Sequence, residues 1–249
     1  MADNGRVALI SGAARGLARG IATNLAQGGY RVAFTYRPGG TPPAQTEQAV
    51  RAMGGAVFSV AADARIAGET LRAVREVEHH FGRIDVLVHA VGPIVVKRFA
   101  RLTMDDTREM IDANFSSAVE AAFAVLPGMR ERGFGRLVYF GMNGSQTTIP
   151  ARGMTLYGAA KAAVVSFARS LALEEAKAGI TVNVIEPGDI REKELSRADA
   201  RTVPAKNPTG HAGSWEDIAY AVRFLVADEA SFINGVCVGV NGGLAEPHE

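Results

Sequence analysis

Tyr157 and Lys161 lie four residues apart in the segment Tyr157-Gly-Ala-Ala-Lys161. If this segment is helical, both side chains lie on one face, with a phenol beside an ammonium group. A phenol has a pKa of about 10 in water, and a neighbouring cation lowers that pKa because it stabilises the phenolate. Such a phenol serves as a general acid or base near neutral pH, which is what reduction of a carbonyl group needs. An exposed helical pair without function has the same spacing and is the alternative interpretation.

A glycine-containing turn follows the first short apolar run of the chain. It reads Ser11-Gly12-Ala13-Ala14-Arg15-Gly16-Leu17-Ala18 and precedes a segment with helical spacing. Glycine lets the backbone bend tightly and approach a diphosphate, and the next helix directs its free N–H groups at that anion. This context, after a strand and before a helix, is the one in which the motif binds a dinucleotide. We therefore expect a phosphate-binding turn, with a plain tight turn as the alternative.

The end of the second apolar run indicates which dinucleotide binds. Proteins that bind NAD usually place Asp or Glu there to hold the ribose hydroxyls. This chain instead has Phe34, Thr35, Tyr36 and Arg37. Arg37 and Arg15 can pair with a 2′-phosphate through charge-assisted hydrogen bonds. The expected cofactor is therefore NADP(H), and the alternative is that Arg37 is a solvated surface residue.

Seven short apolar runs, several of them apolar on both faces, predict strands of a parallel sheet covered by helices on either side. The runs are Val7–Ile10, Arg31–Tyr36, Val57–Ala62, Val86–Ala90, Leu137–Phe140, Val182–Ile185 and Val236–Val240. Helical spacing separates them, as in residues 16–28 and 67–81, and capping boxes occur at Thr103/Asp106 and Ser214/Asp217. Alternation of strand and helix predicts an α/β fold, a doubly wound parallel sheet (Rossmann fold) forming one domain over residues 1–249.

The segment 188–213 departs from this alternation. It is charged, contains Pro204 and Pro208, and has weak periodicity. A long irregular segment inside a compact domain is more often a lid or binding loop than a connection. We therefore expect this segment to cover the substrate.

Composition excludes several classes of protein. The chain has 249 residues with a net charge of +1, and its Lys and Arg residues are scattered, so neither nucleic acid nor a membrane surface is an expected partner. Its single cysteine, Cys237, excludes an internal disulfide and lies in an apolar run, as a buried small side chain would. No secretory signal, membrane-spanning stretch or metal site is predicted, and the expected location is the cytoplasm.

Together these motifs resemble those of the classical short-chain dehydrogenase/reductase family, over nearly the whole chain. Residues 11–18 look like the family's Thr-Gly-x-x-x-Gly-x-Gly turn, and Tyr157 with Lys161 looks like its Tyr-x-x-x-Lys pair. Pro187-Gly188 resembles its Pro-Gly motif, and Asn241-Gly242-Gly243 is typical of the end of its last strand. The chain is most similar to the 3-oxoacyl-[acyl-carrier-protein] reductase branch, which uses NADPH and usually forms tetramers.

The resemblance implies roles for individual residues. Tyr157 donates the proton, Lys161 binds the nicotinamide ribose and lowers the tyrosine pKa, and Asn114 links Lys161 to solvent through a held water. Asp63 contacts the adenine amino group. The other implied cofactor-binding residues are Gly12, Arg15, Gly16, Leu17, Arg37, Ala90, Gly92, Pro187, Gly188 and Ile190.

The sequence also departs from the family pattern. Ala18 replaces the third glycine of the turn, and the usual Asn-x-x-Gly after the fourth strand is His89-Ala90-Val91-Gly92. We expect His89 to be a strand-end histidine rather than a catalytic one. The family's substrate-orienting serine falls on Gly144 by spacing from the tyrosine, or on Met142 by alignment of the strand. Ser145 is the predicted catalytic hydroxyl in its place, and Asn143 is the alternative hydrogen-bond donor.

The expected function is an NADPH-dependent carbonyl reductase of 3-oxoacyl thioesters or similar ketones, in which a small-molecule or acyl-thioester substrate lies against Met154, Leu156 and Val95. An enoyl thioester reductase of the same family is the nearest alternative, and a non-catalytic NADP-binding protein is the alternative from another class. The resemblance also implies a homo-oligomer, either a tetramer or a dimer.

Overall fold

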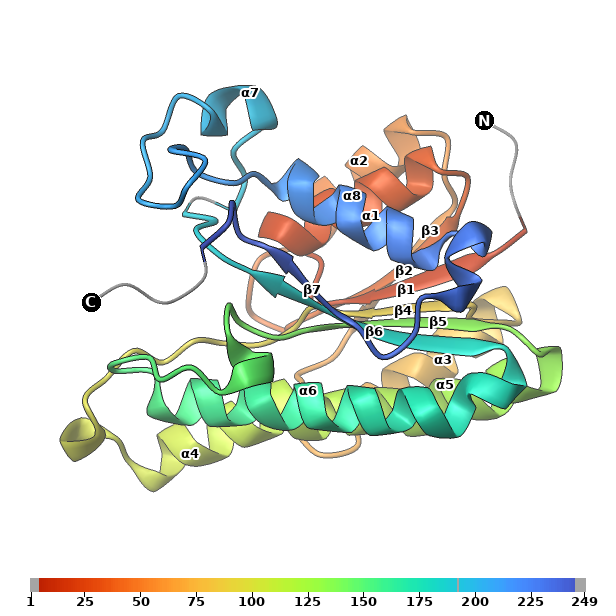
Figure 1. Ribbon diagram of the computed structural model, residues 1–249. Coiled ribbons are helices and arrows are strands. Elements are labelled where there is room, and N and C mark those ends of the chain that lie inside the picture. The colour runs from red at the N-terminus through yellow and green to blue at the C-terminus, as the bar shows by residue number, and fades with distance from the viewer. Residues whose placement is uncertain (1–4, 192, 245–249) are drawn as a thin grey trace.

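A parallel seven-stranded sheet forms the centre of the computed structural model, which describes residues 5–191 and 193–244 (Figure 1). The strand order is β3-β2-β1-β4-β5-β6-β7, and every neighbouring pair is parallel. The strands are β1 Val7–Ser11, β2 Arg31–Tyr36, β3 Val57–Ala61, β4 Val86–His89, β5 Gly135–Phe140, β6 Ile180–Pro187 and β7 Cys237–Val240. The order reverses between β1 and β4, which confirms the predicted doubly wound fold.

Helices cover both faces of the sheet, as Figure 1 shows, with α1, α2 and α8 on one side and α3, α4, α5 and α6 on the other. The helices are α1 Gly16–Gln27, α2 Ala44–Ala52, α3 Glu69–Phe81, α4 Met104–Ile111, α5 Ser117–Arg132, α6 Thr155–Glu175, α7 Arg197–Ala200 and α8 Trp215–Val226. Both predicted capping boxes are confirmed at the starts of α4 and α8. Helix α2 was not predicted because its residues are mostly polar and its amino end has no side-chain cap.

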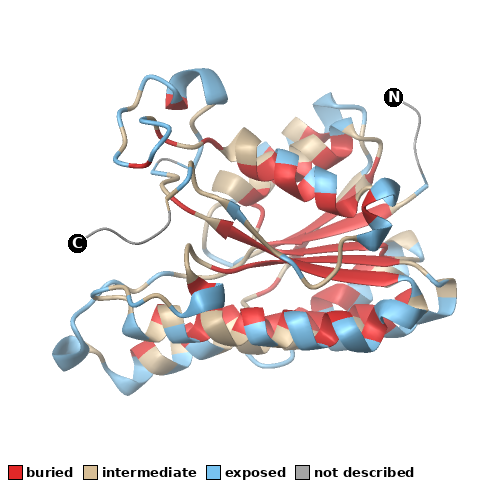
Figure 2. Ribbon diagram, viewed as in Figure 1, coloured by how far each residue is buried: buried red, intermediate tan, exposed pale blue. Residues whose placement is uncertain are grey.

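The core is divided by the sheet into two layers. Successive residues of β1 point to opposite sides, so that Val7 and Leu9 pack with α3, α5 and α6, while Ala8 and Ile10 pack with α1 and α8. Figure 2 shows the strands buried along most of their length and the helices buried on their inner faces. Each fully buried aliphatic side chain contributes about 1.5–3 kcal/mol through removal of apolar surface from water.

Helix α6 and the turn that follows it, Thr155–Ala178, are long and apolar enough to cross a membrane by length and composition alone. This finding corrects the expectation that no stretch approaches a membrane span. The helix packs against the sheet and buries the charged residues Lys161 and Glu175 with its apolar ones, which is how a core helix of a folded domain behaves. Length and hydropathy alone do not distinguish the two cases.

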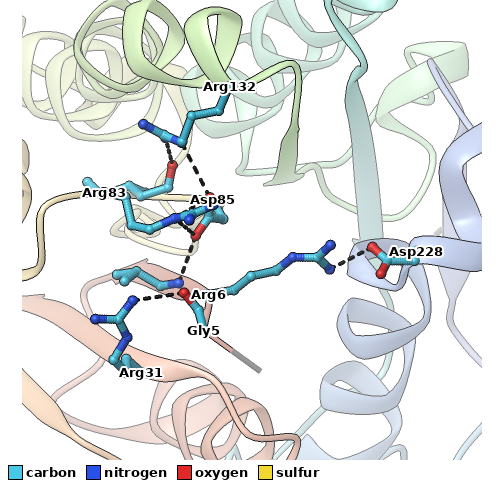
Figure 3. Close-up of polar contacts among 9 residues, drawn as sticks. Gly5, Arg6, Arg31, Arg83, Asp85, Arg132 and Asp228 are labelled. Carbon is cyan, nitrogen blue, oxygen red and sulfur yellow. Dashed lines mark hydrogen bonds and ion pairs between the residues drawn. The ribbon is translucent and has the colours of Figure 1, made fainter. Parts of the chain in front are cut away.

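A cluster of charged groups joins strands and helices at the amino ends of the strands (Figure 3). The carboxylate of Asp85 is fully buried just before β4 and accepts hydrogen bonds from the Val7 backbone N–H and from the guanidinium of Arg83. Arg132, at the end of α5, lies 3.5 Å from the same carboxylate and donates to the Ile84 carbonyl. The cluster lies at the edge of the sheet opposite the carboxyl ends of the strands, so its role is structural.

Replacing Asp85 by Ala should lower the free energy of unfolding by about 3 kcal/mol, because two arginines and a backbone N–H lose their buried acceptor. Urea unfolding followed by circular dichroism measures the change. Asp105→Ala is the matched control, since that side chain is 90% exposed and its ion pair should be worth less than about 0.5 kcal/mol. Equal stability of the two variants would contradict the assignment.

Candidate active site

A cleft of about 1770 Å³ opens at the carboxyl ends of the strands, where the strand order reverses. All the residues implied to bind cofactor line it, and Tyr157 lies in the same cleft. They are Gly12, Arg15, Gly16, Leu17, Arg37, Asp63, Ala90, Gly92, Lys161, Pro187, Gly188 and Ile190. Segments from six parts of the chain therefore meet where ligands of open α/β sheets bind.

The turn before α1 has the backbone conformation that its glycines permit. Gly12 and Gly16 have φ angles of 72° and 64°, in the left-handed region that side chains disfavour. The N–H of Gly12 donates to Thr35 Oγ1 at 3.0 Å, which ties the turn to the end of β2. A Cβ atom at Gly12 would lie 3.3 Å from Val91, so the turn also packs closely against the segment after β4.

A carboxylate lies at the amino end of α1. The Gly16 N–H donates to Glu194 Oε1 at 3.1 Å, and the Arg19 guanidinium contacts the same oxygen at 2.7 Å. The side chain of Lys193 lies against Gly16, with its Cβ 3.4 Å from the place where a glycine Cβ would stand. The predicted phosphate-binding turn therefore faces an anion supplied by the segment 188–213.

Basic residues surround the other end of the cleft. Arg37 follows β2, and Arg65 makes a two-pronged ion pair with Asp63, the implied adenine contact. The Arg65 guanidinium holds the pKa of the Asp63 carboxyl below its usual range, so the carboxylate is charged at neutral pH. Arg65 was missed by sequence reasoning because no motif marks it.

Tyr157 and Lys161 occupy the first turns of α6 and point into the cleft region with 9% and 4% exposure. Burial raises the pKa of Tyr157 to about 12, which corrects the expectation that Lys161 lowers it. Burial and the charge of Lys193 lower the pKa of Lys161 to about 8. The ammonium lies 5.6 Å from the centre of the tyrosine ring, and the raised pKa of Tyr157 comes from the loss of water around the phenol.

Asn114 lies behind the pair rather than in the cleft wall. It belongs to a π-helical turn, Asp112–Ser116, and is fully buried. Its Nδ2 donates to the Pro93 carbonyl at 3.2 Å, and its Oδ1 has no hydrogen-bond partner among the described residues. A Cβ atom at Gly92 would collide with that Oδ1 and lie 3.2 Å from Lys161 Nζ, so Asn114 and Lys161 meet at one glycine.

Ser145, the predicted catalytic hydroxyl, does not line the cleft. Its Oγ donates to Glu186 Oε1 at 2.7 Å and accepts the Met142 N–H at 3.1 Å, beneath the loop that follows β5. Glu186 also accepts the Gln146 N–H, so this buried carboxylate holds the loop in place. The expectation that Ser145 faces the substrate is therefore wrong, because its hydroxyl is bound to the carboxylate of Glu186, a residue distant in the sequence.

The side chains that this loop presents to the cleft are Met142 and Asn143. Asn143 Oδ1 accepts a hydrogen bond from Asn241 Nδ2 at 2.6 Å, and Asn241 also contacts the backbone of its own turn through Leu244 and Gly243. The orientation of the Asn143 amide is therefore determined by the turn after β7. Its Nδ2 is shielded and has no hydrogen-bond partner among the described residues.

His89 is a strand residue of β4, as expected. Its two ring nitrogens lie 3.2 Å from Ser11 Oγ and 3.1 Å from Ser117 Oγ. Burial, with the nearby charge of Lys161, lowers the pKa of His89 to about 3, so the ring is neutral at physiological pH. His89 joins β1 to α5 and has no nitrogen left for chemistry.

Part of the apolar wall differs from the expectation. Met154 lines the cleft, but Leu156 and Val95 do not. The apolar residues that line it instead include Val91, Ile94, Phe140 and Met142. Leu156 precedes Tyr157 in α6, so the helical period directs it to another face of the helix than the one that lines the cleft. Its apolar side chain alone did not predict this orientation.

A nicotinamide dinucleotide fits this set of residues. Packing within the protein requires glycine at two of the implied contact positions: a Cβ atom at Gly188 would lie 2.6 Å from Asn241 Cβ, and one at Gly92 would collide with Asn114. The helix amino end suits a diphosphate, and the arginines suit its phosphates. Fold and site thus define a dinucleotide-binding oxidoreductase with a tyrosine–lysine pair.

Comparison with known proteins identifies the family. The family model described as enoyl-(acyl carrier protein) reductase matches residues 12–245. The 3-oxoacyl-[acyl-carrier-protein] reductase FabG of Escherichia coli is 34% identical over 244 residues, 96% of this chain and 97% of its own. The chain belongs to the short-chain dehydrogenase/reductase family.

Solved structures agree with this assignment. A short-chain dehydrogenase/reductase from Serratia marcescens has a TM-score of 0.88 at 29% identity, covering 98% of this chain and 100% of its own. A blue fluorescent protein from a metagenomic library, in complex with NADPH, has the same TM-score, identity and coverage.

The depressed pKa of Lys161 predicts a pH-dependent stability. Folding holds the Lys161 pKa at about 8 against 10.5 in the unfolded chain, so below pH 8 the buried charge costs roughly 3 kcal/mol. That cost should disappear as the pH rises from 8 to 10.5. The variant Lys161→Met should therefore be more stable than wild type at about pH 7 and lose most of that advantage by about pH 10.

Urea unfolding of the cofactor-free protein at both pH values measures this change. Lys177→Met is the control because Lys177 is exposed, and its difference from wild type should not vary with pH. A constant difference for the Lys161 variant would contradict the assigned pKa.

Proposed function

We propose that the protein is an NADPH-dependent carbonyl reductase that acts on 3-oxoacyl thioesters or similar ketones. The observation that carries the proposal is a buried, protonated phenol, Tyr157, one helical turn from the ammonium of Lys161 in the cleft that begins at the glycine turn. Such a phenol can donate a proton but is not ionised at neutral pH, which suits reduction rather than proton abstraction.

The cofactor would be held along the cleft by the residues already described. The glycine turn and the amino end of α1 hold the diphosphate, Asp63 the adenine, Lys161 the nicotinamide ribose, and the backbone around Gly188 and Ile190 the carboxamide. When bound, the reduced nicotinamide supplies a hydride to the substrate carbon. Arg37 and Arg15, with no acid at the end of β2, favour a cofactor with a 2′-phosphate, and one structural neighbour binds NADPH.

Tyr157 then donates its proton to the substrate oxygen as the alcohol forms. An alkoxide is a stronger base than a phenolate, so this transfer is favourable even from a phenol of pKa about 12. Lys161 stabilises the phenolate left behind because an opposite charge nearby favours the ionised form. Asn114, whose Oδ1 beside Gly92 has no hydrogen-bond partner among the described residues, would hold a water that returns the proton from solvent.

A second hydrogen bond to the substrate oxygen falls to Asn143 rather than Ser145. A buried N–H without a partner costs about 1–3 kcal/mol, and a hydrogen bond to the substrate would recover that free energy. Asn143 Nδ2 has no partner among the described residues, but it is shielded while Asn241 holds the amide, so the proposed contact requires the amide to turn toward the substrate. The Ser145 hydroxyl is occupied by Glu186.

The substrate would lie against Met142, Met154 and Ile94, with the segment 188–213 as its lid. This apolar wall suits an acyl chain, and the FabG relative is named for 3-oxoacyl substrates. The matching family model carries the name of an enoyl reductase, and the thioether of Met142 near Gly158 replaces a hydroxyl donor, so an enoyl thioester reductase is the second candidate. A cytoplasmic homo-oligomer is the expected form of either.

Oxidation of NADPH with a panel of ketones, 3-oxoacyl thioesters and enoyl thioesters tests the function. Wild type should reduce a 3-oxoacyl thioester and prefer NADPH to NADH, and Tyr157→Phe should lose at least about 100-fold in kcat because the proton donor is gone. Turnover of enoyl thioesters alone would favour the second candidate. Full activity of Tyr157→Phe would remove the catalytic assignment.

The role of Asn143 predicts a separate loss. Asn143→Ala should lower kcat/KM for the ketone by about 10-fold to 100-fold, since removing a donor to a developing oxyanion has an effect of this order or larger. The affinity for NADPH should stay within about twofold. Gln146→Ala, which alters an exposed neighbour in the same loop, is the control and should keep wild-type kinetics. An unchanged kcat/KM in the Asn143 variant would contradict the role of Asn143 and indicate that a backbone N–H of the loop is the donor to the substrate oxygen.

A further inference from the structure

The carboxylate of Glu194 occupies the place where a cofactor phosphate would bind. Its Oε1 accepts the Gly16 N–H at 3.1 Å and contacts Arg19 Nη2 at 2.7 Å. Helix α1 has no acidic residue in its first turn and no side-chain cap at its amino end. Its positive end is therefore paired with an anion from a segment more than 170 residues further along the chain.

Helix amino ends bind carboxylates and phosphates through the same N–H groups. A dinucleotide held by the glycine turn needs the Gly16 N–H, which Glu194 already uses. The two anions would also repel each other if both stayed. Binding of the cofactor therefore requires Glu194 to leave.

We infer that Glu194 is an internal competitor for the cofactor diphosphate, and that Arg19 is a cofactor-binding residue which Glu194 holds until the cofactor arrives. The inference rests on the dinucleotide site of the proposed function but not on its substrate. It couples two events: the diphosphate displaces Glu194, and the segment 188–213 is released from α1 when the cofactor is in place.

The contact is suited to exchange. The Glu194 side chain is 62% exposed, and an exposed ion pair contributes little to stability, so a ligand can displace it. The segment keeps other attachments, since Asn207 Nδ2 donates to Asp189 and Arg197 pairs with Asp217. Arg19 stays oriented by Gln45, and its Nε is buried without a partner among the described residues.

The dissociation constant of NADPH, measured by the change in its fluorescence on binding, tests the inference without turnover. Glu194→Gln should bind NADPH roughly three- to tenfold more tightly than wild type, because the competing charge-assisted contacts are weakened. Glu194→Asp should also bind more tightly, since its shorter side chain keeps the charge but no longer reaches the Gly16 N–H. Glu229→Gln, which removes an exposed charge that does not line the cleft, should stay within about twofold.

Two further measurements separate a contact from a general charge effect. Arg19→Ala in the Glu194→Gln background should weaken NADPH binding, because the ion pair with Glu194 is already gone and the substitution then removes only the contact of Arg19 with the diphosphate. Trypsin cleavage after Arg191 and Lys193 should be accelerated by NADPH in wild type and already be fast in cofactor-free Glu194→Gln.

Tighter binding by Glu194→Gln with wild-type binding by Glu194→Asp would show a long-range charge effect and overturn the inference. Unchanged or weaker binding by Glu194→Gln would overturn it as well. A protein that binds NADPH in this way but reduces no ketone would contradict the proposed function alone, so the two can fail separately.

Discussion

The reversal of strand order between β1 and β4 is the constraint on which the rest of the structure depends. Parallel strands all end at the same edge of a sheet, and crossovers to opposite sides leave a crevice at that edge between the two halves. The turn after β1, the segment after β4, and the ends of β5, β6 and β7 all reach this crevice. Segments that are far apart in the chain thus share one site.

Burial at this site changes the proton affinity of two ionisable groups, Lys161 and Tyr157. Lys161 is nearly inaccessible and loses part of its affinity for protons, while Tyr157 is held in its protonated form by the same loss of water. A ligand that brings polar groups and negative charge would favour the charged lysine. The charged cluster around Asp85, at the opposite edge, joins strands and helices where no ligand is expected.

Two hydrogen bonds within the protein change the interpretation of the loop after β5 and of the segment 188–213. Ser145 binds Glu186 and supports the loop, while Asn143, whose amide oxygen accepts from Asn241, lines the cleft. Glu194 serves the amino end of α1 in the way that a phosphate would. In both cases a group that could bind a ligand, the Ser145 hydroxyl or the Gly16 N–H, is instead hydrogen-bonded within the protein.

The sequence by itself determined the fold class and most of the cleft. Apolar runs predict strands, glycines mark the turn, and the four-residue spacing of Tyr157 and Lys161 places them on one helical face, because each of these signals is local along the chain. Tertiary structure alone decided the partners of Ser145 and Glu194, the raised pKa of Tyr157 and the burial of an apolar helix against the sheet. Those properties depend on which groups distant in the sequence come into contact and on how much water remains around them. Local sequence patterns predict neither the contacts nor the amount of water.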